Sequence, residues 1–181
     1  MTLRTWSLVA ASAVVVIAFP AAIELPKILL WNPSPSAPIG LYHLRPTGTL
    51  QVADLVVVDL PEPLARFVIG RGYLPAGIPL LKRVVGLPGQ TVCRSHRAIA
   101  IDGVEIGAAL ETDRLGRPMP VWQGCRRIAA DEVFLMNRDV ENSLDGRYFG
   151  PIPVSSIRGA AMPLWTDGER IGRDRWRVNT D

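Results

Sequence analysis

Short apolar segments separated by turn residues recur along this 181-residue chain and restrict the folds that it can adopt. The segments are rich in β-branched residues, which favour strands, and glycine, proline or aspartate bounds them. Predicted strands cover 52–60, 79–87, 97–107, 131–137 and 156–165. Turn signals at intervals of about 8–12 residues are typical of barrels and sandwiches. The sequence therefore predicts a mainly β fold with a single short helix over 65–73. The glycines of this segment have a low helix propensity and count against the helix.

The clearest hairpin lies within 97–107, where apolar residues alternate with small or polar residues around Asp102 and Gly103. An Asp-Gly pair between two such segments favours a two-residue turn, because both turn positions take a positive φ. We therefore expect two antiparallel strands in this segment, joined at Asp102 and Gly103.

The N-terminal region differs in character from the rest of the chain. The run from Thr5 to Ile23 has no charged residue and is mostly apolar, and Arg4 precedes it. About 20 such residues cross a hydrocarbon core of about 30 Å. We therefore predict a retained membrane anchor over 1–23, with a cytoplasmic N-terminus by the positive-inside rule. A cleavable secretory signal with small residues near Ala21 is the alternative, and both alternatives export the remaining chain.

The exported part of the chain has three regions that differ in composition. Residues 24–33 are interpreted as a proline-containing linker, 34–165 as one globular domain and 166–181 as a polar tail. A domain of that length can bury a substantial core. The formal net charge is +3, and the basic residues are scattered along the chain. This scatter argues against nucleic acid as a partner.

The chain has two cysteines, Cys93 and Cys125. In an exported domain an even number favours a disulfide, which would close a loop of about 30 residues and contribute roughly 3–4 kcal/mol. Two separate buried thiols are the alternative. A metal site is not expected, because the histidines, His43 and His96, have no ligand partner at the spacing of zinc sites. No cofactor is expected either.

Two fragments far apart in the chain carry the candidate chemistry. The segment SPSAPIGLY at 34–42 places serine hydroxyls between prolines, which limit backbone freedom and suit a preorganised nucleophile. The segment LLKRVVGLPG at 80–89 places Lys82 in an apolar run. A lysine can remove the proton of a serine only when it is neutral, and burial lowers its pKa from about 10.4. An ordinary lysine on a solvated strand is the alternative.

A third segment, MNRDVENSLDGRYFGP at 136–151, is dense in polar residues and follows a predicted apolar strand. One interpretation is a surface loop that turns at Asp145 and Gly146. The other is a hydrogen-bonded scaffold that supports the serine and the lysine.

Together the three fragments resemble the sequence boxes of the signal peptidase I family of Ser/Lys proteases. SPSAPIGLY resembles the nucleophile box S-x-S-x-P-x-G-L/I-Y, and LLKRVVGLPGQTV resembles the lysine box K-R-V-x-G-x-P-G-D. NRDVENSLDGRYFGPIPVSSIRG resembles the C-terminal box. The resemblance spans 32–160 in the order of the family. It implies a signal-peptidase-like, β-rich catalytic domain behind a single N-terminal transmembrane helix.

The resemblance also implies roles for individual residues. Ser36 corresponds to the nucleophile and Lys82 to the general base. Ser34 corresponds to the residue whose hydroxyl completes the oxyanion hole with the backbone N–H of Ser36. Ser143 corresponds to a serine that orients the lysine.

Three further residues match supporting positions of the family. Asp145 and Arg147 correspond to an ion pair, and Arg83 corresponds to the arginine that follows the lysine. Two positions depart from the family pattern, with Gln90 in place of Asp and Gly146 in place of Ser.

The short chain, the small insert between boxes and the form of the nucleophile box resemble the TraF-type conjugative-transfer peptidases. This resemblance implies a protein of the bacterial inner membrane with its catalytic domain on the periplasmic side. The implied partners are the lipid bilayer and a membrane-inserted preprotein, above all a conjugative pilin precursor. In that relative, cleavage is coupled to cyclisation of the pilin.

The sequence is also compatible with three other functions. The first is a general signal peptidase I that acts on many exported preproteins. The second is a Ser-His-Asp triad that uses Ser36 with His43 or His96. The third is a non-catalytic, membrane-anchored subunit of a transfer complex.

Overall fold

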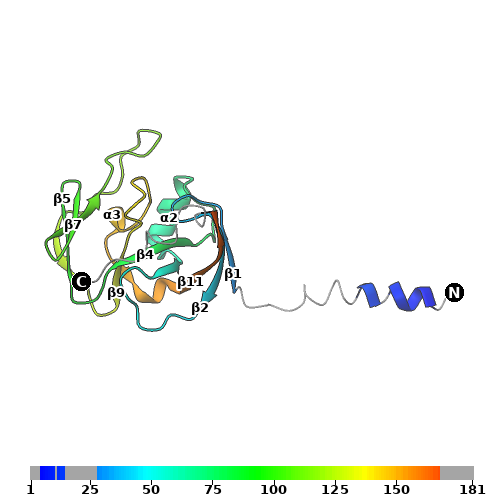
Figure 1. Cartoon of the computed structure of the whole chain (residues 1–181). Helices are drawn as coiled ribbons and strands as arrows, with labels where there is room; N and C mark the ends of the chain where they lie inside the picture. Colours follow the sequence, from blue (N-terminus) through cyan, green and yellow to red (C-terminus); the bar gives the residue numbers. More distant parts are fainter. Residues whose placement is uncertain (1–4, 11, 15–27, 168–181) are drawn as a thin grey trace.

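The computed structural model describes residues 5–10, 12–14 and 28–167 of the chain. The described part is mainly β, as the turn spacing predicts, and its strands form two antiparallel sheets (Figure 1). Its helices are short. Those outside the N-terminal region are the α-helices α2 (Glu62–Gly70) and α3 (Gly146–Phe149) and the 3-10 helix η1 (Val154–Ser156).

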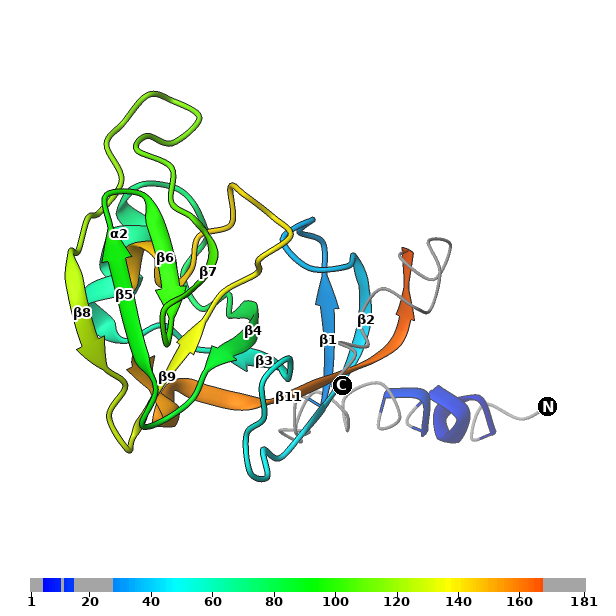
Figure 2. The ribbon, with the colours of Figure 1, turned by 60° about the vertical axis from the view of Figure 1, so that its left-hand side comes forward.

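The larger sheet has seven strands in the order β1-β2-β11-β3-β4-β9-β10. Its strands in chain order are β1 (Leu29–Asn32), β2 (Gly40–Arg45), β3 (Leu55–Val58), β4 (Leu80–Gly86), β9 (Glu132–Leu135), β10 (Ile152–Pro153) and β11 (Ile157–Thr166). Strand β11 is the longest and pairs with β2 along one part and with β3 along another. This strand therefore joins the end of the sheet that carries the N-terminal strands to the end that carries the lysine segment (Figure 2).

The smaller sheet has four strands in the order β7-β6-β5-β8. They are β5 (Thr91–Ser95), β6 (Ala98–Ile101), β7 (Val104–Ala108) and β8 (Gly124–Arg127). Strands β6 and β7 form the predicted hairpin, with positive φ at Asp102 and Gly103. The Asp-Gly turn prediction is confirmed.

Each of the five predicted strand segments coincides with a strand, and all but β11, which matches its predicted length, are shorter than predicted. The predicted helix is also present as α2, but it begins three residues before 65–73 and ends at Gly70. Strands β1, β2, β5, β8 and β10 were not predicted as separate elements. Strand β1 falls within the segment 24–33 that was interpreted as a linker, and it pairs with β2 from Leu29 opposite His43 to Asn32 opposite Gly40.

The predicted membrane anchor falls largely on residues outside the described part of the chain. Among the described residues, no helix is long and apolar enough to cross a membrane. The predicted tail over 166–181 likewise lies almost wholly outside them. Its first residues are described, since Thr166 ends β11 and the N–H of Asp167 donates to the carbonyl of Ile39 (2.9 Å).

The apolar core lies on both faces of β4, which is why that strand can bury a polar side chain. Val84 packs with Val56, Val58 and Leu135 in one cluster, and Leu81 packs in another cluster with Tyr42 and Val57, among others. In register, Lys82 lies opposite Val56 of β3. The lysine is thus fixed on a central strand, opposite an apolar residue of the neighbouring strand.

Candidate functional site

Ser36 lies in the turn that joins β1 to β2, and the amide of Asn32 holds this turn in shape. Asn32 Nδ2 donates to the carbonyls of Ser34 (2.9 Å), Ala37 (3.1 Å) and Pro38 (3.1 Å). Its Oδ1 accepts from the N–H of Ser34 (3.1 Å). One buried side chain thus satisfies four backbone groups of a proline-containing turn that has few partners of its own.

The two serines of the turn face each other. Ser34 Oγ donates to Ser36 Oγ (3.0 Å), and the backbone N–H of Ser36 donates to Ser34 Oγ (3.3 Å). The N–H of Ser36 and the hydroxyl of Ser34 are therefore adjacent donors beside one candidate nucleophile. Adjacent donors of this kind are what an oxyanion requires.

Lys82 is 3% exposed on β4, and its Nζ donates a hydrogen bond to Ser143 Oγ (2.6 Å). Burial lowers the pKa of Lys82 from 10.5 to about 8, because the ammonium loses its hydration. The nearby carboxylate of Asp145 opposes this change in pKa, and the guanidinium of Arg147 adds to it. The lysine can therefore be neutral within the range of mildly alkaline pH.

Asp145 and Arg147 form a buried ion pair beneath Lys82, with Arg147 NH2 and Asp145 Oδ2 2.9 Å apart. Arg147 is 1% exposed and also donates to the carbonyls of Val140 (2.6 Å) and Glu141 (2.9 Å). These bonds fold the 137–145 segment around the guanidinium. The ion pair thereby fixes the loop from which Ser143 reaches the lysine.

Asn137 links the serine turn to the lysine strand, a role that the sequence did not reveal. Its Nδ2 donates to the carbonyls of Ser36 and Leu81, the second at 3.0 Å. Its Oδ1 accepts from the N–H of Arg83 (3.1 Å). The peptide groups on both sides of Lys82 are thus tied to the backbone of Ser36 through one side chain.

A groove of about 550 Å³ brings the candidate residues together, and we call it the Lys82 groove. Its lining includes Ser34, Ser36, Lys82 and Ser143. A second, smaller hollow of about 310 Å³ lies against the other side of the serine turn and includes Ser36 and Arg83. Four of the seven supporting and catalytic candidates therefore share the Lys82 groove, and Ser36 borders both cavities.

Arg83 points away from the lysine, as expected for the next residue of a strand. Its NH1 donates to the carbonyl of Ala53 (2.9 Å). Burial lowers the pKa of Arg83, and the carboxylate of Asp139, which lines the same hollow, opposes that shift. Arg83 therefore lines the hollow beside the serine turn and does not face the Lys82 groove.

Comparison with known proteins identifies the family. Residues 2–165 match the model of signal peptidase, peptidase S26. The chain belongs to the S26 signal peptidase family.

Three known proteins are similar to this chain. The conjugal transfer protein TraF of Agrobacterium fabrum is 37% identical over 146 residues, which cover 75% of this chain and 81% of that protein. A plasmid transfer protein TraF of Escherichia coli is 31% identical over 147 residues, 79% of each chain. A crystal structure of a signal peptidase I from Enterococcus faecalis matches with a TM-score of 0.37 and 21% identity, over 62% of this chain and 97% of that one.

Both departures from the S26 pattern have a structural reason. A Cβ on Gly146 would lie 2.6 Å from Phe134 Cε2 and 2.7 Å from the carbonyl oxygen of Leu135, so a serine does not fit there. Gln90 Oε1 accepts from the N–H of Leu87 (2.8 Å), and its Nε2 donates to Asp102 Oδ2 (2.8 Å). An uncharged amide can serve both contacts, whereas a carboxylate there would face Asp102.

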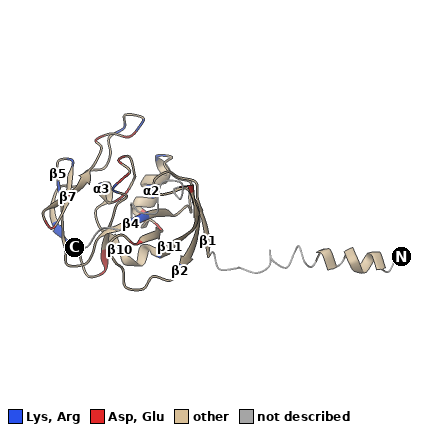
Figure 3. Ribbon diagram, in the orientation of Figure 1, with Lys and Arg blue, Asp and Glu red and all other residues tan. Residues whose placement is uncertain are grey.

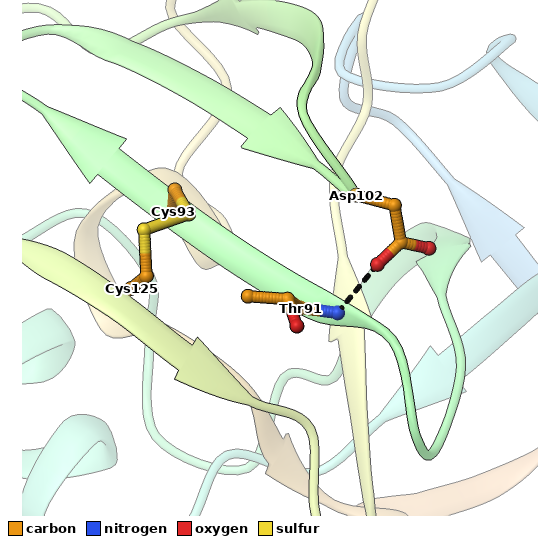
Figure 4. The surroundings of a disulfide bond; sticks show 4 residues. All are labelled: Thr91, Cys93, Asp102 and Cys125. Atoms are coloured by element: carbon orange, nitrogen blue, oxygen red, sulfur yellow. Dashed lines mark hydrogen bonds between the residues drawn. A yellow bond between two sulfur atoms is a disulfide. The ribbon is translucent and has the colours of Figure 1, made fainter.

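Cys93 and Cys125 form a disulfide across β5 and β8, the pairing that an exported domain favours (Figure 4). In the same sheet, the carboxylate of Asp102 accepts from the N–H of Thr91 (2.7 Å). His43 accepts a hydrogen bond from Arg45 (3.3 Å), and His96 lies in the turn after β5. Neither histidine lines the two cavities beside Ser36, and the described residues contain no cluster of acids, cysteines and histidines that could hold a metal.

Proposed function

We propose that this S26 family protein is a membrane-bound serine endopeptidase in which Ser36 is the nucleophile and Lys82 the general base. One observation carries the proposal. A fully buried lysine with a pKa lowered to about 8 lines the same groove as a serine hydroxyl. Lysine acts as a base only in its neutral form, and the lowered pKa makes that form accessible at a lower pH than in water.

In the proposed reaction, Lys82 Nζ removes the proton of Ser36 Oγ as that oxygen attacks the scissile carbonyl carbon. The oxyanion accepts from the N–H of Ser36 and from the hydroxyl of Ser34, which rotates away from Ser36 Oγ. Lys82 then returns the proton to the leaving amine, and the acyl group stays on Ser36 as an ester. Water activated by Lys82 cleaves that ester and restores the hydroxyl.

The other candidates act as positioning residues in this scheme. Ser143 orients the Lys82 amine through the 2.6 Å hydrogen bond. Asp145 and Arg147 hold the loop of Ser143, and Arg83 and Asn137 hold the strand of Lys82 against the serine turn. Each of these contacts limits the motion of one reacting group.

We propose a membrane-inserted preprotein as substrate, most specifically the pilin precursor of a conjugative transfer apparatus. The similarity to transfer proteins of Agrobacterium fabrum and Escherichia coli supports this choice. An amine of the substrate could attack the Ser36 ester in place of water, which would cyclise the product. A general signal peptidase would instead process many preproteins and rescue a host depleted of its leader peptidase.

We place the protein at the periplasmic face of the bacterial inner membrane, and exposed apolar side chains support contact of this domain with a bilayer. They lie on β1 and at the end of β11, namely Leu29, Trp31, Leu164 and Trp165. The rings of Trp31 and Trp165 are stacked, with centroids 6.0 Å apart. Tryptophan is enriched where proteins meet the membrane interface, and the Ser36 turn directly follows β1.

The direct test uses the full chain in proteoliposomes with a membrane-spanning precursor that has small residues at the first and third positions before the cleavage site. Ser36→Ala, Lys82→Ala and Lys82→Arg should each abolish processing, because either partner alone is nearly inactive and arginine cannot be deprotonated. Ser95→Ala, an exposed serine on β5, serves as the control. Retained activity in Lys82→Ala together with lost activity in His96→Ala would contradict the Ser/Lys dyad and support a Ser-His-Asp triad.

A further inference from the structure

The Lys82 groove extends well beyond the proposed dyad. At about 550 Å³ it continues from Ser36 to the loop at 71–74 and to residues 110–119. A substrate with small residues at the scissile bond would fill only the end near Ser36. Cavities of about 300–1,000 Å³ hold whole drug-sized ligands, so the rest of the groove has room for further residues of a peptide.

One wall of this outer part is formed by residues 109–120, which we call the arm. The arm lies between β7 and β8 and projects from the smaller sheet as the yellow-green loop at the top of Figure 2. It doubles back on itself, since Thr112 pairs with Pro118 and the N–H of Asp113 donates to the carbonyl of Arg117 (2.9 Å). The disulfide at Cys93 and Cys125 closes the chain segment that contains it.

The carboxylate of Asp113 fixes the shape of the arm. It accepts hydrogen bonds from the hydroxyl of Tyr73 (2.7 Å) and from Arg117 Nε (2.7 Å). It also accepts from the backbone N–H groups of Leu115 (2.9 Å) and Arg117 (2.9 Å). Four donors on one carboxylate hold the tip of the arm in a single orientation.

A second set of contacts fastens the arm to the loop that follows α2. Arg71 NH1 donates to the carbonyl of Pro118 (2.8 Å), and Arg117 NH2 donates to the carbonyl of Arg71 (3.2 Å). The arm and this loop therefore form one wall of the groove. Hydrogen bonds hold the two segments of this wall together.

Basic side chains outnumber acidic ones among the residues of this wall that line the groove, and Glu111 of the arm is not one of these residues. Arg71, Arg114 and Arg117 line the groove, and Asp113 is the only acid among the described lining residues. Asp113 pairs with Arg117. Arg71 lies over the ring of Phe67 (4.9 Å) and donates to a neutral carbonyl, and Arg114 is exposed at the tip of the arm. The basic residues at the end of α2 and on the arm appear in blue at the top of Figure 3.

We propose that the arm is a second recognition surface for the substrate, at which Arg71 and Arg114 bind an acidic side chain of the peptide that lies in the Lys82 groove. This inference rests on the proposed peptidase function. Two positive charges beside a groove select an acidic partner by electrostatic complementarity. The contact lies away from the scissile bond, so it determines which precursors are cleaved and leaves the chemistry at Ser36 unchanged.

The test is a competition between two precursors in the same proteoliposomes. The two precursors share one cleavage site and differ at a single position, which is Asp in one and Lys in the other. The experiment is repeated with this Asp/Lys difference placed at each position of the segments that flank the site. The ratio of processing rates gives the ratio of kcat/KM directly. At one or two positions we expect the wild-type protein to favour Asp about tenfold, which corresponds to about 1.4 kcal/mol.

Arg114→Glu should remove or invert this preference at the same positions and leave the processing of a precursor without a charge there unchanged. The matched control is Arg66→Glu, whose side chain is 76% exposed on α2 and lies outside the groove. Equal processing of the Asp and Lys precursors at every position would overturn the role of the arm. An unchanged preference in Arg114→Glu would do the same. Failure of the wild-type protein to process any precursor would instead contradict the proposed peptidase function.

Discussion

Lys82 occupies a position where its charged form is costly. Apolar strands flank it, and the hydroxyl of Ser143 is its hydrogen-bond partner. The guanidinium of Arg147 nearby further disfavours a second positive charge, although Asp145 partly offsets this. The lowered pKa of Lys82 is thus a consequence of where β4 runs through the core.

A pH titration tests this property of Lys82. The pKa of Lys82 is lowered from 10.5 to about 8, so proteolytic activity should rise with pH and reach half of its maximum near pH 8. Lys27 and Lys82 are the only lysines in the sequence, so selective 13C labelling of lysine gives two signals to follow by NMR. A Lys82 signal that titrates near 10.5 would contradict the proposed base.

The same pKa shift links stability to pH. The unfolded chain, with an ordinary lysine pKa, binds more protons than the folded chain between about pH 8 and about pH 10.5. The contribution of Lys82 to the free energy of unfolding should therefore increase as the pH rises through this window. Below about pH 8, Lys82 is protonated in the folded state as well, and the burial of its charge lowers the free energy of unfolding.

Asn137 offers a second test at the residue scale. Asn137→Asp keeps the acceptor for the N–H of Arg83 but loses the donors to Ser36 and Leu81. We expect kcat to fall about 100-fold, because small displacements of reacting groups have effects of that size, while KM changes little. Circular dichroism and thermal melting provide the control for folding. An unchanged kcat in a folded variant would remove Asn137 from the positioning residues.

At the scale of secondary structure, the disulfide joins β5 to β8 and closes the segment that carries the arm. Replacing both Cys93 and Cys125 by serine should lower the free energy of unfolding by roughly 3–4 kcal/mol, since the unfolded chain gains freedom. Denaturant unfolding of the full chain with and without reductant measures this. Wild-type protein in reductant should match the variant, and equal stability in all three samples would contradict the prediction.

The elements that sequence patterns predicted are those with a local signal. The apolar run of β4 and the Asp-Gly turn after β6 are visible in any short window of the sequence. Strands β5 and β8 alternate poorly, and β8 contains two consecutive arginines, so their pairing depends on partners elsewhere in the chain. Strand β1 lies beside prolines that suggested a linker.

The site residues that could be predicted are likewise those that lie in a recognisable stretch of sequence, whereas roles that depend on contacts between distant residues could not be predicted. Resemblance to family boxes singled out Ser36, Lys82 and Ser143, which the structure places around one groove. Asn137 opens the segment that resembles the C-terminal box, but its role was not assigned, because its contact with the Ser36 carbonyl spans 101 residues. The Asn-Pro pair before the first serine is a signal that could have identified Asn32 as the organiser of a turn.

At the scale of the whole molecule, the candidate site and the exposed apolar face lie near one another in the chain. Ser36 follows β1, whose Leu29 and Trp31 are exposed, and β1 follows the predicted anchor closely. We therefore expect a membrane-spanning precursor to be cleaved at least tenfold more efficiently than a soluble peptide of the same sequence. Initial rates at equal substrate concentration measure the difference. Equal rates would contradict placement of the site at the bilayer.

Covalent labelling of Ser36 tests the central claim of a Ser/Lys dyad most directly. The full chain is treated with a serine-reactive acylating probe across a range of pH, and the labelled residue is identified by mass spectrometry. The account predicts one label on Ser36, with a rate that rises through about pH 8, the pKa of Lys82. It also predicts that Lys82→Ala loses this label while remaining folded. A label on another residue, or equal labelling of Ser36 in Lys82→Ala, would contradict the account.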